Sequence, residues 1–180
     1  MTKVTELKEK ITIPEKIKAA FENNLLTING EKGSLSRVFS HPAIDMKING
    51  NIIEIICKNA RRKDKALVGT FVAHIKNMIK GVNEGFEYKM KTVFSHFPIK
   101  TSVEGSEFVI QNFLGERSPR KAKILEGVTV EAKGDDITIQ GIDKEKVGQT
   151  VANIERATAV KYRDIRVFQD GVYRVNKGGK

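Results

Sequence analysis

Arginine and lysine side chains gather in three short stretches of the chain, and the chemistry that they offer together is the binding of phosphate groups. The stretches comprise Lys58, Arg61, Arg62, Lys63 and Lys65; then Arg117, Arg120, Lys121 and Lys123; then Arg156, Lys161, Arg163, Arg166, Arg174, Lys177 and Lys180. From residue 156 to the end, seven basic residues face two acidic ones, a net charge of +5. The whole chain of 180 residues has a formal net charge of +10. This balance favours a polyanionic partner over a merely soluble basic protein.

Residues that could catalyse a reaction do not converge in the sequence. The three histidines are widely separated: His41, His74 and His96. None has a ligand at metal-binding spacing, and the chain lacks a phosphate-binding glycine loop and a nucleophile elbow. Asp135 and Asp136 form the most compact acidic pair, but they follow a glycine where aspartates usually form turns. We therefore expect no enzyme, catalytic residue, metal or cofactor; a nuclease using this pair and Asp143 is a competing hypothesis.

The single cysteine, Cys57, lies in the apolar run 52–57, which excludes a disulfide or a cysteine metal site within one chain. We expect it to be a small buried strand residue. No stretch approaches the roughly 20 apolar residues of a membrane span. These observations predict a cytosolic, reducing environment.

The elements that must position the basic stretches are encoded twice. Residues 17–33 align with residues 99–115 without a gap. Further along the chain, two sets of seven residues have the same types at the same spacing. The first set is Asp64, Lys65, Val68, Gly69, Val72, Ala73 and Ile75; the second is Asp143, Lys144, Val147, Gly148, Val151, Ala152 and Ile154. A period of about 80 residues indicates a duplicated domain rather than a solenoid. With a joint between residues 94 and 98, we expect domains at 1–95 and 96–180.

The repeat resolves an ambiguous segment near the N-terminus. Residues 14–24 look helical by propensity, but their counterpart, residues 99–105, is rich in β-branched residues and ends in glycine. We therefore predict a strand at residues 17–22 and its counterpart. Each copy would begin with one hairpin, 17–22 with 25–29 and 99–104 with 108–111. A second hairpin would follow, with turns at Asn49-Gly50 and Gly134-Asp135.

A helix and a closing strand complete each predicted copy. Apolar residues at helical spacing predict helices over residues 63–80 and 144–158. Gly69 and Gly148 recur inside them, which indicates either close packing on a sheet or chance retention after duplication. Asp170-Gly171 predicts a final hairpin between residues 165–168 and 172–175. The predicted fold class is α+β, with two tandem duplicated domains, each a mostly antiparallel β-sheet with one covering α-helix.

The two basic stretches of the second copy favour a nucleic-acid face there. The chain has no Trp and only three Tyr, whereas proteins that read single strands stack bases on many exposed aromatic rings. We therefore expect folded RNA to be recognised by backbone and shape, with local contacts at Tyr162 and Tyr173. Since charged loop residues are usually exposed, replacing Arg120 and Lys121 should barely change thermal stability.

The sequence resembles a known family, the universal large-subunit ribosomal protein six family in its archaeal and eukaryotic branch. The resemblance covers nearly the full chain. It depends on Gly69-Thr70, Ala73-His74-Ile75, Asn77-Met78, Gly81-Val82, Gly85-Phe86 and Tyr88, on residues 112–116, on Asn153-Ile154-Glu155 and Thr158, and above all on residues 164–173. Asn83 replaces an expected threonine, and many members carry a longer basic C-terminal extension than this sequence, which stops at Lys180.

The resemblance implies a non-enzymatic constituent of the large ribosomal subunit, located in the cytoplasmic ribosome. It would bind large-subunit ribosomal RNA mainly through its second repeat, beside neighbouring ribosomal proteins and near the docking site of translational GTPases. The RNA-binding residues that it implies are Arg117, Arg120, Lys121, Lys123, Arg156, Lys161, Arg163 and Arg166, with secondary contacts at Arg61, Arg62 and Lys63. The alternative is an RNA-binding module outside the ribosome.

Overall fold

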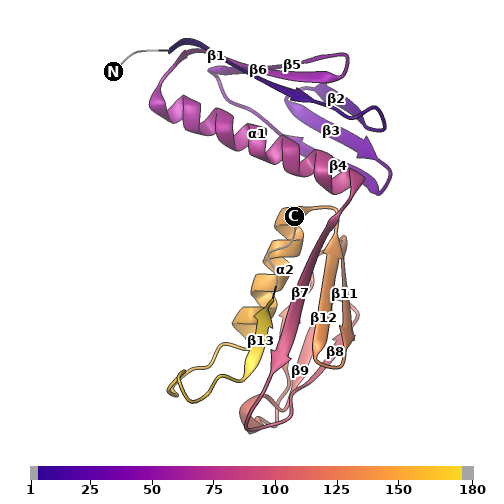
Figure 1. The fold of residues 1–180 in the computed structure, drawn as a ribbon, viewed down its shortest axis with the longest axis vertical. Helices are drawn as coiled ribbons and strands as arrows, with labels where there is room; N and C mark the ends of the chain where they lie inside the picture. Colours follow the sequence, from indigo (N-terminus) through magenta and orange to yellow (C-terminus); the bar gives the residue numbers. More distant parts are fainter. Residues whose placement is uncertain (1–3, 176–180) are drawn as a thin grey trace. The chain divides into compact units, whose positions relative to one another are not determined.

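The computed structural model describes residues 4–175 and divides into two compact units, Met1–Glu84 and Gly85–Lys180. Each unit contains two antiparallel sheets and one long helix (Figure 1). The α+β fold class and its duplication are therefore confirmed.

The first unit has one helix packed on two three-stranded sheets. Its elements are β1 (Val4–Thr12), β2 (Lys18–Glu22), β3 (Leu25–Gly30), β4 (Gly33–Val38), β5 (Ile44–Asn49), β6 (Ile52–Ala60) and α1 (Arg62–Asn83). The sheet orders are β1-β6-β5 and β2-β3-β4, and α1 packs on β3 of one and β6 of the other. Their inward residues Ile28 and Ile55 are fully buried, as are Ile75 and Val82 of the helix. Cys57 is buried on the same face of β6, as the sequence predicted.

The second unit repeats this plan with one additional strand. Its elements are β7 (Phe86–Val93), β8 (Lys100–Glu104), β9 (Glu107–Gln111), η1 (Phe113–Gly115), β10 (Arg120–Lys123), β11 (Val128–Lys133), β12 (Asp136–Gly141), α2 (Lys144–Ala157) and β13 (Gly171–Arg174). The sheet orders are β10-β9-β8 and β11-β12-β7-β13. α2 packs its buried face, which includes Val147 and Ile154, into a core with Phe108, Ile110 and Ile139.

The segment with helical propensity near the N-terminus forms the β2–β3 hairpin, as the repeat predicted. Asn23 and Asn24 form its turn with backbone φ values of 50° and 63°. Asparagine tolerates this left-handed conformation well, and two such residues make the primed turn that suits a hairpin. Tertiary pairing and turn chemistry therefore outweigh local helix propensity here.

The boundary between the units differs from the predicted joint at residues 94–98. The predicted first domain, residues 1–95, includes β7, but β7 pairs with β12 and β13 of the second unit. Its buried residues Phe86, Tyr88 and Met90 alternate with exposed ones, so its apolar face is committed to a sheet of the second unit.

The place beside β6 that corresponds to β7 is taken by β1, a strand that the sequence prediction missed. β1 pairs with β6 over eight register positions. Leu7 and Ile11 pack against the core, while Glu6, Lys8 and Lys10 are exposed. The strand was not predicted because the charged residues on its outward face, which are typical of an edge strand, outnumber the apolar residues between them.

The predicted hairpin around Asp170-Gly171 is wrong. Residues 165–168 form no strand, and β13 pairs instead with β7, which lies beside it in Figure 1. Asp170 has no exposed surface. Its carboxylate accepts hydrogen bonds from the backbone amides of Ser95 and His96, which are far away in the sequence.

Close packing does not explain the recurring helix glycines. A Cβ added at Gly69 or Gly148 would meet nothing within 4 Å beyond its own helix backbone. Gly69→Ala is therefore expected to raise the free energy of unfolding by about 1 kcal/mol, because alanine restricts the unfolded chain and favours helix. Chemical unfolding followed by circular dichroism measures this.

A matched control is available in the same unit. At Gly30 an added Cβ would lie 2.8 Å from the Val82 carbonyl oxygen and side chain, so Gly30→Ala should destabilise. A Gly69→Ala protein no more stable than the wild type would contradict the helix argument.

Candidate nucleic-acid interface

The fold brings the two basic stretches of the second unit into contact. The loop between η1 and β10, followed by β10, carries the stretch from Arg117 to Lys123, and β10 packs on α2. Arg120 donates from Nη1 to the carbonyl oxygen of Ala157 at 2.8 Å, where α2 ends. Asn153 of α2 donates to the carbonyl oxygen of Lys123 at 3.0 Å. Sequence stretches more than 30 residues apart therefore form one basic region.

We define the basic region by the candidate residues of the second unit that are exposed. These are Arg117, Lys121, Lys123, Arg156, Lys161, Arg163 and Arg166. In β10, Ala122 is buried between exposed Lys121 and Lys123, as strand alternation requires. The seven side chains present cationic groups to solvent, where a phosphate backbone could contact them.

Arg120, the eighth candidate, lies among protein groups, and its side chain is only 26% exposed. Its Nε and Nη2 donate to the two Glu116 oxygens at 2.7 and 2.6 Å, a bidentate pair. Its guanidinium carbon lies 4.3 Å from the centre of the Phe113 ring. Arg120 is therefore not the exposed loop residue that the sequence predicted, and we now expect its replacement to lower the stability of the second unit.

Oppositely charged neighbours favour the charged forms of Glu116 and Lys121. Hydrogen bonding to Arg120, opposed by burial and assisted by the charges of Arg120 and Arg163, lowers the pKa of Glu116. A hydrogen bond to Glu107 at 2.7 Å raises the pKa of Lys121. The Lys121–Glu107 ion pair is about half exposed, so it contributes little to stability and leaves the lysine accessible.

The segment between α2 and β13 forms an open loop that carries three cations of the basic region (Figure 1). Asp164 organises this loop, since its side chain accepts from the Arg166 amide at 2.9 Å and its carbonyl from the Phe168 amide at 2.9 Å. Lys161, Arg163 and Arg166 around this turn are exposed. The turn thus points cationic side chains outward from a fixed backbone.

Asp170 anchors the C-terminal end of this loop. Its carboxylate accepts from the Ser95 amide at 2.9 Å, the His96 amide at 3.3 Å and His96 Nδ1 at 3.2 Å. Burial alone would raise its pKa, but these hydrogen bonds hold the pKa of Asp170 below its ordinary value. No local pattern could reveal this role, because the donors are some 75 residues earlier in the chain.

In the first unit, Arg61, Arg62 and Lys63 are exposed at the start of α1. Asp64 accepts from the Arg61 amide at 2.9 Å and caps the helix. The Asp64 carboxylate offsets the unfavourable position of these cations at the positive end of the helix dipole. Their exposed side chains remain accessible to a phosphate group.

The acidic residues of the nuclease hypothesis serve the fold. Asp143 is the N-cap of α2 and accepts from the Glu145 amide at 2.9 Å, and Asp135 lies in the β11–β12 turn. Within residues 4–175, no three His, Cys, Asp or Glu side chains are placed to hold a metal ion. Neither described helix is both long enough and apolar enough to cross a bilayer.

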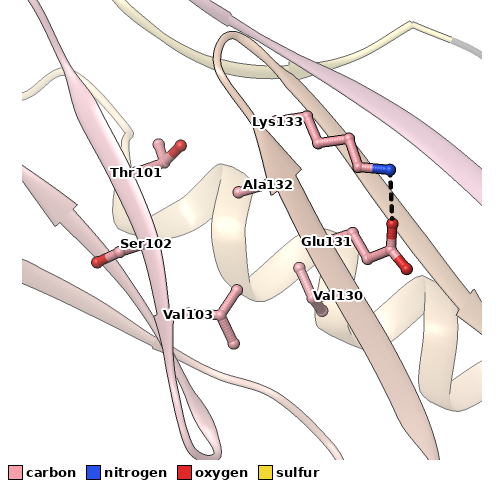
Figure 2. Close-up of a pocket in the computed structure, with 7 residues that line it drawn as sticks. All are labelled: Thr101, Ser102, Val103, Val130, Glu131, Ala132 and Lys133. Carbon is pink, nitrogen blue, oxygen red and sulfur yellow. Dashed lines mark ion pairs between the residues drawn. The ribbon is translucent and has the colours of Figure 1, made fainter.

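A shallow groove of about 460 Å³ lies between β8 and β11 (Figure 2). One wall is formed by Thr101, Ser102 and Val103, and the other by residues 130–133. Lys133 pairs with Glu131 at 3.2 Å on its own strand, as the dashed line marks. The groove is therefore an open surface of mixed polar and apolar residues and holds no converging catalytic set.

Comparison with known proteins agrees with the duplicated architecture. The family model described as "Ribosomal protein L6" matches residues 13–85 and again residues 97–171. The chain belongs to this family. A "Large ribosomal subunit protein uL6" of Methanobrevibacter smithii is 49% identical over 98% of this chain and 99% of the relative. Proteins of the same name from Picrophilus torridus and Methanosarcina mazei are 47% and 45% identical, over 96% and 97% of this chain and 96% and 99% of theirs.

The family assignment confirms the resemblance found in the sequence, including its archaeal branch. Two L6 repeats, matched separately, also agree with the two α+β units. The matched ranges omit residues 86–96, which contain β7.

Proposed function

We propose that this protein is a structural constituent of the large ribosomal subunit and binds folded ribosomal RNA mainly through its second unit. The observation that carries the proposal is the Arg120–Ala157 contact, which joins two separate basic stretches into one region with seven exposed cations. Phosphate contacts of this kind supply affinity and position a protein on RNA. Membership of the L6 family supports the ribosomal setting.

The first unit contributes secondary contacts through Arg61, Arg62 and Lys63, whose exposed charges lie at the start of α1. Neighbouring ribosomal proteins are the further partners, and the docking site of translational GTPases lies close by. Family resemblance supports these two points. The expected absence of catalysis belongs to the same proposal.

Arg117→Ala with Lys123→Ala is expected to weaken binding to deproteinised large-subunit ribosomal RNA. These side chains make no hydrogen bond or ion pair with the described residues of the chain, so thermal stability should stay nearly unchanged. The dependence of log affinity on log salt should fall by roughly 0.7–0.9 for each phosphate that the variant no longer neutralises. Filter binding over a salt series measures both quantities.

The matched comparison is Arg61→Ala with Arg62→Ala, which removes the same number of charges from the first unit. We expect a smaller reduction in affinity, because the basic region of the second unit carries more exposed cations. A larger reduction in this comparison would reverse the roles proposed for the two units. An unchanged affinity and salt slope in the first double variant would remove the basic region as the RNA-binding surface.

A further inference from the structure

Tyr162 is held in an unusual state for an aromatic residue. Its backbone φ is 59°, in the left-handed region, which is unfavourable by roughly 1–2 kcal/mol for a residue with a bulky side chain. Its side chain is also wholly exposed, with a relative accessibility of 103%. Neither the backbone conformation nor packing within the described chain accounts for a tyrosine here, so its ring is available to an external partner.

The residue next to Tyr162 begins a layered arrangement of side chains at the base of the loop. The Arg163 guanidinium carbon lies 4.7 Å from the centre of the Phe168 ring. On Phe168 stacks His96, with ring centroids 4.7 Å apart and an interplanar angle of 26°. His96 in turn donates to the buried carboxylate of Asp170. The layers therefore fix the position of Arg163 although the residue itself is exposed.

We infer that Tyr162 and Arg163 form a stacking site for one unpaired nucleobase of the bound RNA. This inference rests on the function proposed above and names the RNA feature that the loop recognises. Bases splayed from loops and bulges of folded RNA stack on tyrosine rings and on arginine planes. Lys161 and Arg166 lie in the same loop and are exposed, so they can hold the adjoining phosphates.

The charge of the loop selects RNA over a protein partner. Ile165 and Val167 are also exposed, at 69% and 59%, and a protein partner would use them. However, residues 161–166 contain three cations and a single acid, and the cations flank Tyr162 directly. A nucleotide can stack its base on the Tyr162 ring while its phosphates pair with the flanking cations. An apolar protein surface would contact the ring and leave the cations without anionic partners.

Two substitutions at one position test the stacking site. Tyr162→Phe keeps the ring, and Tyr162→Asn removes it while suiting the left-handed backbone, so both proteins should fold as stably as the wild type. With deproteinised large-subunit ribosomal RNA as the probe, Tyr162→Phe should bind within about twofold of the wild type. Tyr162→Asn should bind roughly tenfold to a hundredfold more weakly. Its salt slope should be unchanged, because every cation that neutralises a phosphate is still present.

The outcomes separate this inference from the function on which it rests. If the wild-type protein binds the RNA and Tyr162→Asn binds equally well, the stacking site is wrong while RNA binding stands. If Tyr162→Asn retains RNA affinity but leaves purified large subunits at lower salt, the ring contacts a neighbouring protein, which also overturns the inference. Failure of the wild type to bind would overturn the proposed function itself.

Discussion

Asp170→Ala is expected to lower the free energy of unfolding of the second unit by about 2–4 kcal/mol. The substitution removes a fully buried carboxylate that accepts hydrogen bonds from two backbone amides and a histidine ring. The amides of Ser95 and His96 would be left without that acceptor. Chemical unfolding followed by circular dichroism measures the change, with two transitions fitted if the units unfold separately.

The pH dependence of this effect has a definite sign. Because the folded pKa of Asp170 is depressed, its charged form stabilises the fold above the unfolded pKa, and this contribution is lost as pH falls through the folded pKa. Asp170→Asn keeps the shape and removes the charge. The stability difference between wild type and Asp170→Asn should therefore be constant near neutrality and shrink at strongly acidic pH. A difference that grows on acidification would contradict the assigned role.

Arg120→Met is expected to lower the free energy of unfolding by about 2–3 kcal/mol. The substitution removes a bidentate pair with Glu116, hydrogen bonds to the carbonyl oxygens of Ala157 and Ala159, and a cation–π interaction with Phe113. Hydrogen bonds to charged groups contribute more than neutral ones. Methionine keeps much of the apolar stem, so the change in stability reports mainly on the guanidinium.

Lys121→Met, one residue along the same strand, is the matched control. The Lys121 side chain is 54% exposed and pairs with the half-exposed Glu107, so its removal should change stability by less than about 1 kcal/mol. Thermal unfolding of the two variants side by side measures the contrast. Equal and small effects would show that the Arg120 interactions do not hold β10 to α2.

RNA affinity adds a second readout for the same pair. Removal of the Lys121 charge should reduce the salt slope, since this exposed cation belongs to the basic region. Removal of the Arg120 guanidinium should weaken binding indirectly, because the loop that carries Arg117 becomes disordered. The larger change is then expected in the free energy of unfolding. A stabilising background such as Gly69→Ala acts on the other unit and would leave this contrast unchanged.

Local patterns predicted the two helices and the second hairpin of each repeat well. Gly134-Asp135 forms the β11–β12 turn with Gly134 at φ 62°, and α2 begins within a residue of its expected position. The strand at residues 18–22 could be predicted only because its counterpart in the second repeat carries a clearer signal. A duplicated chain thus gives two independent readings of one fold.

The misassigned segments depend on contacts that are distant in the sequence. β7 follows the first helix directly, so only its pairing with β12 and β13 shows to which unit it belongs. Asp170-Gly171 has the local chemistry of a turn, but the buried amides that bind Asp170 lie near residue 95.

Exposure of the candidate site was predictable for most residues and not for Arg120. Charged residues in loops and on outward strand positions are solvated unless a specific partner captures them, which describes Arg117 and Lys123. Arg120 forms an ion pair with Glu116, four residues earlier, and a hydrogen bond with the carbonyl oxygen of Ala157 at the end of α2. The spacing to Glu116 was visible in the sequence, but the approach of α2 required the fold.

Sedimentation of a gentle cell lysate through sucrose gradients, at moderate and then high salt, tests the central claim most directly. The protein should migrate with the large ribosomal subunit at both salt concentrations, because buried and multivalent RNA contacts resist screening better than single exposed charges. Its presence only at the top of both gradients would contradict the ribosomal assignment and favour an RNA-binding module that acts outside the ribosome.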